Sequence, residues 1–113
     1  MDVAPGRWFP LTADYIEALP NKAGVFEVAN LVRNVLYIAR GEGHLRERVA
    51  AMGPVPSHLP PCPGGHYFRF ELTPKEDDAL ERRIKSFQSR HRGRLPVGNL
   101  HEDQAVREAR CAA

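Results

Sequence analysis

The chain has 113 residues, of which 42% are hydrophobic and 27% are charged, and its formal net charge is +2. This length suits one domain with a single core and excludes a core plus a second module. So small a net charge is no argument for nucleic-acid binding. The basic residues are unevenly distributed, however: they crowd residues 40–48 and 82–94, while acidic residues gather at 76–78.

Cysteine and histidine spacing argues against a disulfide framework and against a zinc site. Cys62 and Cys111 lie far apart, which favours free thiols and a reduced, cytoplasmic setting. The histidines show no zinc-ligand spacing. The first ten residues lack the apolar run of a signal peptide, and no later segment is apolar enough to span a membrane, so we expect no membrane association.

The first half of the chain predicts a helix, a hairpin and a second helix. After an irregular lead-in over residues 1–10, Thr12 is the expected N-cap of a short helix that ends at Pro20. Two β-rich runs, VFEVA and VLYIA, flank the segment NLVRN, and this pattern is typical of an antiparallel hairpin. HLRERVAAM then carries apolar residues at helical spacing and ends at Gly53.

The second half predicts a loop, a strand and a long helix. Prolines and glycines cluster over residues 54–65, which we interpret as a rigid surface loop. HYFRFEL follows and alternates between aromatic or aliphatic and polar residues, as a strand does. Thr73 is the expected N-cap of the helix, with Pro74 in its first position and Glu76 completing a capping box. The apolar stripe predicts that this helix runs to about His91.

The element order α–β–β–α–β–α predicts an α/β (α+β) fold. We expect one domain over residues 1–113, with its core at about 22–100 and a polar tail at 101–113. The simplest compact arrangement is a three-stranded antiparallel sheet flanked by helices.

The predicted hairpin carries two tripeptides on adjacent strands, Gly24-Val25-Phe26 and Tyr37-Ile38-Ala39. Arg48 follows Tyr37 by eleven residues on the next helix, Ala79-Leu80-Glu81 lies on the long helix, and Pro96-Val97-Gly98-Asn99 comes after it. In this order, the motifs resemble the signature of the GIY-YIG nuclease family. The resemblance covers roughly residues 22–100 and agrees with the element order predicted from periodicity.

The resemblance implies an endonuclease that hydrolyses phosphodiester bonds in DNA with Mg²⁺ or Mn²⁺ as its cofactor. Glu81 would be the metal ligand, because such hard cations prefer oxygen. Arg48 would hold a phosphate oxygen with its planar, charged guanidinium group, and Tyr37 would orient or deprotonate the water. Asn99 would position groups by neutral hydrogen bonds. We therefore expect Tyr37, Arg48 and Glu81 to line one concave face, with Phe26 beside them.

Two positions depart from the family pattern. Phe26 stands where the family usually has tyrosine, so a hydroxyl group is lost. Ala39 stands where the family has glycine, and its methyl group could crowd a substrate.

Ordinary structural interpretations also apply to the site residues. Tyr37 is typical of a packed strand aromatic, and Arg48 of a solvated helix residue. Glu81 lies one helical turn before Lys85, the spacing and order of a surface ion pair.

Three functional hypotheses follow. The leading one is an endonuclease acting on structured or damaged DNA, which would need a protein partner or a homodimer for sequence specificity. The alternative is a catalytically degenerate GIY-YIG-fold protein that acts as an interaction or assembly subunit. The third is a non-catalytic nucleic-acid-binding module that uses its basic helices.

Overall fold

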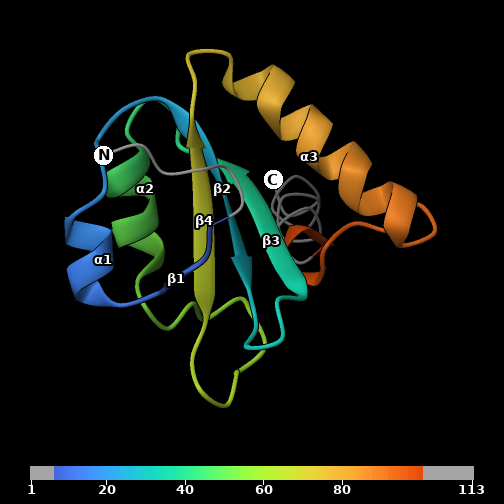
Figure 1. Cartoon of the computed structure of the whole chain (residues 1–113), viewed down its shortest axis with the longest axis horizontal. Coiled ribbons are helices and arrows are strands. Elements are labelled where there is room, and N and C mark those ends of the chain that lie inside the picture. Colours follow the sequence, from blue (N-terminus) through green and yellow to red (C-terminus); the bar gives the residue numbers. More distant parts are fainter. Residues whose placement is uncertain (1–6, 101–113) are drawn as a thin grey trace, which may run out of the picture.

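The computed structural model describes residues 7–100, which form an α+β fold (Figure 1). A single antiparallel sheet lies between helices on its two faces. The elements, in chain order, are β1 (Phe9–Pro10), α1 (Ala13–Glu17), β2 (Gly24–Ala29), β3 (Val35–Arg40), α2 (Leu45–Met52), β4 (Tyr67–Leu72) and α3 (Glu76–Arg90). No helix among these residues is long and apolar enough to cross a membrane.

The sheet has four strands in the order β1-β4-β2-β3, so the expectation of three strands is wrong. The additional strand is β1, which lies within the segment predicted to be irregular and pairs Phe9 with Phe68 of β4. Its formation has a clear cause, because Phe9 is buried in the core and its ring packs 5.9 Å from that of Phe68. The three predicted strands, and the hairpin of β2 and β3, are confirmed.

Helices α1 and α2 cover one face of the sheet and α3 covers the other (Figure 1). The main apolar core lies on the α1 and α2 side, where Ile16, Leu45 and Val49 of the helices meet Phe26 and Tyr37 of the sheet. Because side chains alternate along a strand, Glu27 lies on the opposite face from its neighbour Phe26, beneath α3. The two faces therefore differ in chemistry: the first is apolar, whereas the second combines buried apolar residues, among them Val25 and Ile38, with charged ones.

Helix α3 begins later than predicted, and its first residue has another role. The N-cap is Lys75 without a side-chain cap, whereas Thr73 Oγ1 accepts a hydrogen bond from the Lys75 N–H. Glu76 does not close a capping box: its Oε2 accepts from the N–H groups of Gly24, at 2.8 Å, and Gly43, at 3.0 Å. It thereby ties the start of α3 to the start of β2 and to the loop before α2. The predicted end of the helix, near His91, is confirmed.

The proline-rich segment 54–65 is a loop, as predicted, but it is not confined to the surface. Pro56 and Leu59 are buried, and Leu59 belongs to the main core. His66, just after the loop, is also buried, and its Nε2 lies 3.1 Å from the Pro60 carbonyl oxygen. The loop therefore closes one end of the core instead of extending from it.

Candidate functional site

Tyr37 and Arg48, which lie on β3 and α2, meet as expected. Arg48 Nη2 donates to the Tyr37 hydroxyl oxygen at 2.9 Å. Tyr37 is only 1% exposed, so its phenol is part of the core and not of an open surface. A hydrogen bond from a charged donor to a buried phenol holds both side chains in place. This pair is the part of the predicted site that the fold assembles.

His58, from the proline-rich loop, lies against this pair. Its ring packs edge-on against the Tyr37 ring, with centroids 4.8 Å apart. Sequence reasoning tested the histidines only for zinc-ligand spacing, and it missed this position of His58. The tip of a loop gives no periodic signal, so only the packing of the loop onto the core could reveal the contact.

The two positions that depart from the GIY-YIG signature, Phe26 and Ala39, both lie in the core. Phe26 is fully buried, and its ring contacts that of Tyr37 edge-on at 5.9 Å. The Arg48 guanidinium carbon lies 5.9 Å from the centre of the Phe26 ring. Ala39 is 7% exposed and belongs to the same apolar cluster. Phe26 thus lies beside Tyr37, as expected, while the Ala39 methyl group packs into the core.

Glu81 does not join Tyr37 and Arg48, so the expectation that the three line one concave face is wrong. Glu81 lies on α3, which covers the other face of the sheet (Figure 1). Its side chain is 64% exposed, and its Oε1 lies 2.8 Å from Nζ of Lys85, the residue one turn later. Hydrogen bonding to the Lys85 ammonium lowers the pKa of Glu81. The ordinary interpretation, a surface ion pair, is confirmed for this residue.

The residues present do not fit the metal centre that the resemblance implies. The carboxylate that would hold the metal is separated from Tyr37 and Arg48 by the sheet itself. Among the described residues, no group of three or more histidine, cysteine, aspartate or glutamate side chains has a metal-binding arrangement. We therefore derive no chemistry through a metal at this site.

The Asn99 side chain pairs with the outer edge of β3 as the main chain of a neighbouring strand would. Its Oδ1 accepts from the Ile38 N–H at 2.9 Å, and its Nδ2 donates to the Ile38 carbonyl oxygen at 2.7 Å. Because β3 is an outer strand, these main-chain groups face away from β2 and need partners. An amide side chain supplies one donor and one acceptor, as a neighbouring strand would. Asn99 thus lies next to the strand of Tyr37, in a position that explains its residue type structurally.

Replacing Asn99 with alanine should lower the free energy of unfolding by about 2 kcal/mol, because two buried backbone groups of Ile38 lose their partners. Urea denaturation measures this loss. Asn34→Ala is the matched control: Asn34 is exposed in the hairpin turn and should change stability by less than about 0.5 kcal/mol. Equal stability of the two variants would show that the hydrogen bonds between Asn99 and the Ile38 main chain do not stabilise the fold.

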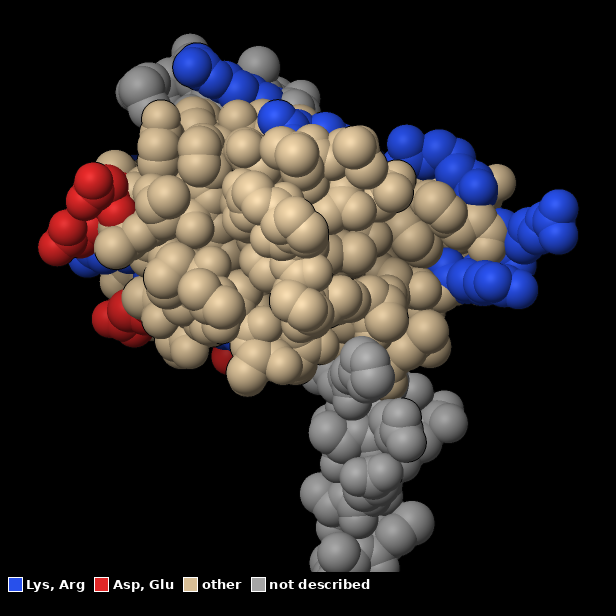
Figure 2. Space-filling view, turned by 90° about the horizontal axis from the view of Figure 1, so that it is seen from below, with Lys and Arg blue, Asp and Glu red and all other residues tan. Residues whose placement is uncertain are grey.

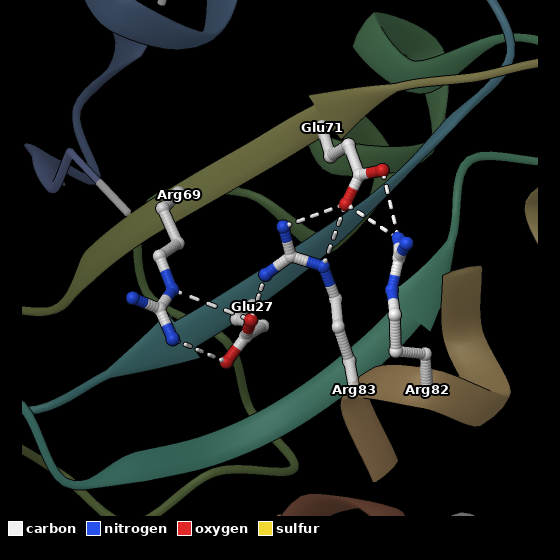
Figure 3. Close-up of polar contacts among 5 residues, drawn as sticks. All are labelled: Glu27, Arg69, Glu71, Arg82 and Arg83. Atoms are coloured by element: carbon white, nitrogen blue, oxygen red, sulfur yellow. Dashed lines mark hydrogen bonds and ion pairs between the residues drawn. The ribbon is translucent and has the colours of Figure 1, made fainter. Parts of the chain in front are cut away.

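A network of charged residues connects α3 to the sheet (Figure 3). Glu27, which is only 3% exposed, accepts hydrogen bonds from Arg69 of β4 and from Arg83 of α3. Arg83 also donates to Glu71, at 3.0 Å, and Arg82 donates to Glu71 from the outer side, at 2.8 Å. Burial of Glu27 is tolerated because each of its oxygens is paired. The network connects three elements by charge.

The ionisation of Glu71 shows the strength of these contacts. Burial on its own would raise the pKa of this carboxyl, but the hydrogen bonds and charges of Arg83 and Arg82 together lower it below its usual value. Glu71 therefore stays ionised and keeps its arginine partners in place at neutral pH.

The network escaped sequence reasoning, although a signal for it was present. Glu27 interrupts an otherwise apolar strand, VFEVA, and Arg69 and Glu71 share one face of YFRFEL. Opposite charges on one face of strands that become neighbours predict ion pairing. The sequence does not state that β2 and β4 are neighbours, so the pairing could not be predicted from it.

A second group of arginines lies at the C-terminal end of α3. We call Arg90, His91, Arg92 and Arg94 the basic turn; these residues surround a surface hollow of about 310 Å³. Basic side chains project from the end of the molecule that holds this part of α3, and acidic ones from the opposite end (Figure 2). Within residues 7–100, Arg92 and Arg94 pair with no carboxylate, in contrast to Arg82 and Arg83.

Comparison with protein families matches residues 1–92 to the family described as a domain of unknown function, DUF7508. The match covers most of the chain, which therefore belongs to this family. It includes the positions of Tyr37, Arg48 and Glu81. Comparison with curated proteins and with solved structures finds no match.

Proposed function

We propose that this DUF7508 chain is a GIY-YIG-like domain that binds nucleic acid without cleaving it, and that the basic turn is its contact surface. The observation that carries the proposal is the contrast between paired and unpaired arginines on α3 and the turn that follows it. Arg82 and Arg83 neutralise carboxylates, whereas Arg92 and Arg94 are exposed and have no acidic partner within the described residues. Cations without a partner are the ones that attract a phosphate backbone.

The local backbone supports this assignment. Arg92 has a φ of 55°, and Gly93 a φ of 78°, so the chain turns sharply directly after the helix. Gln88 Nε2 donates to the Gly93 carbonyl oxygen at 3.2 Å, and the Gly93 N–H donates to the Gln88 carbonyl oxygen at 2.8 Å. The turn therefore presents its arginines from a fixed backbone, which reduces the entropy lost on binding a phosphate strand.

The arrangement around Tyr37 supports binding rather than cleavage. The phenol is buried, its ring is covered by His58, and the expected metal-binding carboxylate lies across the sheet. Hydrolysis needs a nucleophilic water and a group that stabilises the leaving oxygen. The Glu81 carboxylate, which the resemblance gives as the metal ligand for these tasks, does not reach this pair.

Binding should be measured by fluorescence anisotropy with a labelled DNA duplex and with single-stranded DNA, over a range of salt concentrations. Replacing both Arg92 and Arg94 with glutamine should weaken binding and reduce the slope of log Kd against log salt by about 2, roughly one per lost phosphate contact.

The control for that variant is the double change Arg40→Gln with Lys85→Gln. It removes the same charge from two residues that are already paired, with Asp77 and Glu81. If this control weakens binding as much as the basic-turn variant, the effect is due to net charge alone and the assignment of the surface is wrong. If neither variant nor wild type binds DNA, the assembly role becomes the better proposal.

DNA hydrolysis is the second candidate function, favoured by the hydrogen bond between Arg48 and Tyr37. The test is to incubate plasmid and branched DNA with the protein and Mg²⁺ or Mn²⁺, beside Glu81→Ala. Cleavage that is lost in Glu81→Ala would replace the binding proposal with the nuclease. Absence of cleavage, together with salt-dependent retention of DNA, agrees with the binding module.

A further inference from the structure

The face of the sheet beneath α3 contains a groove that the proposed DNA contact does not use, apart from Arg90. It lies between α3 and strands β2 and β4, has a volume of about 400 Å³ and is open on one side. Its wall is almost entirely charged or polar, and is formed by Glu27, Arg69, Glu71, Arg82, Arg83, Ser86 and Arg90.

The lining carries more positive than negative charge. Four arginines face two glutamates, so the groove has a formal charge of +2 when all six groups are ionised. Both glutamates are already engaged: Arg69 and Arg83 bind Glu27, while Arg82 and Arg83 bind Glu71 (Figure 3). The excess charge therefore belongs to guanidinium groups and matches a doubly charged anion.

Several guanidinium N–H groups on the groove wall have no acceptor among residues 7–100. Arg69 donates to Glu27 through Nε and Nη2, and Arg82 donates to Glu71 through Nη2. Arg90 donates through Nε to the Ser86 carbonyl oxygen, which leaves its two terminal nitrogens for a ligand. A phosphate group offers several oxygens and accepts such hydrogen bonds well.

Two of the four arginines, Arg69 and Arg83, are also held in position before any ligand arrives. The Arg69 guanidinium stacks over the Trp8 ring at 4.5 Å, and its other contacts are to the buried Glu27. Arg83 is clamped between two carboxylates and is 12% exposed. Ordering a free arginine side chain opposes binding, so a network that has already ordered its arginines favours an anion.

From these observations, we infer that the groove beneath α3 is a binding site for a phosphate monoester, the dianionic group of inorganic phosphate, a nucleotide or a phosphorylated nucleic-acid end. The glutamates orient the arginines, and Arg82 and Arg90 close on the ligand from the helix. The site is distinct from the basic turn, with which it shares only Arg90.

Binding is tested with the full chain by calorimetric titration and by thermal unfolding, with chloride at equal ionic strength as the reference. Inorganic phosphate and a nucleoside 5′-monophosphate are the small probes. An oligonucleotide with a 5′-phosphate, compared with the same strand without it, tests the nucleic-acid source. We expect at least one phosphate monoester to bind and to raise the unfolding temperature.

Arg82→Gln and Arg90→Gln should each weaken this binding roughly tenfold, the effect of losing one charge-assisted hydrogen bond. Glu71 keeps Arg83 in the first variant, so the fold is retained. Lys85→Gln is the control, because it removes the same charge from α3 outside the groove. The double change Arg92→Gln with Arg94→Gln should keep phosphate binding even where it loses DNA binding.

Two results would overturn the inference. One is that no phosphate monoester raises the unfolding temperature above the chloride reference. The charged network would then only hold α3 against the sheet. The other is that Arg82→Gln and Arg90→Gln bind phosphate as well as Lys85→Gln does. Both results are independent of the DNA measurement, so failure of this site and failure of the proposed function are distinguishable.

Discussion

Replacing Glu27 with glutamine should lower the free energy of unfolding by about 3 kcal/mol, the lower end of the range for breaking a buried ion pair. Glu27 is 3% exposed, and Arg69 and Arg83 both depend on it for charge compensation. Glutamine has nearly the same shape, but it removes the charge and turns an amide N–H₂ group toward guanidinium donors. We expect a loss at the lower end of the range for buried ion pairs because the side chains of Arg69 and Arg83 remain 22% and 12% exposed to solvent. Urea denaturation at neutral pH measures the loss.

Glu81→Gln is the matched control for this prediction. It is the same substitution, also in an ion-paired glutamate, but Glu81 is 64% exposed and its partner Lys85 is 71% exposed. Water screens this pair, so the free energy of unfolding should stay nearly unchanged. If Glu27→Gln is as stable as Glu81→Gln, the charged network contributes nothing to stability, and the positioning of the groove arginines loses its support.

Replacing Gly24 with alanine should cost about 3 kcal/mol, the upper part of the usual range for overpacking. A Cβ atom at this position would lie 2.4 Å from the carbonyl oxygen of Glu71. That oxygen belongs to the backbone of β4, which pairs with β2 here, so it cannot move aside without separating the strands. The loss should appear in urea denaturation as a lower midpoint with an unchanged slope.

Gly65→Ala is the control for this prediction. It separates the need for a positive φ from the need for close approach between strands. Gly65 has a φ of 86° and open space around its Cβ position, so alanine there costs about 1 kcal/mol of backbone strain. Gly24 is needed for the close approach of two strands. A loss in Gly24→Ala no larger than that in Gly65→Ala would show that strand contact is not the cause.

The prediction for Gly24 also concerns the motifs that resemble the GIY-YIG signature. The first tripeptide begins with Gly24, whose N–H donates to Glu76 while its Cα faces β4. The last residue of the P-x-x-N motif, Asn99, completes the edge of β3. Both residues thus have a structural reason to be what they are. Their presence is therefore explained by the packing of the strands and is no argument for catalysis.

Much of the secondary structure followed from local pattern alone. The β-rich runs VFEVA and VLYIA and the alternation in HYFRFEL predicted β2, β3 and β4, and helical spacing predicted α2 and the end of α3. Strand β1 was missed because two residues carry no periodicity. The start of α3 was misplaced because Glu76 matched a local capping box, whereas its carboxylate pairs with distant backbone groups.

The candidate site was predictable only in part. Tyr37 and Arg48 meet because a strand and the helix that follows it are brought together by a short connection, and their spacing in the sequence reflects this. Glu81 comes 33 residues after Arg48 in the sequence, and nothing in its local pattern distinguished a site residue from a partner of Lys85. Its position depended on the side of the sheet that α3 covers.

Periodicity within each strand is a local property, and it divides the residues of a strand into two faces without saying what covers either one. Which helix covers which face depends on side chains that are far apart in the sequence. Here the charged residues Glu27, Arg69 and Glu71 line the face that α3 crosses, and Arg82 and Arg83 of that helix pair with the glutamates. The amino-acid order therefore contained strands β2, β3 and β4, the helices and the Tyr37–Arg48 pair. The placement of Glu81 and the groove arose only when those charges met across the sheet.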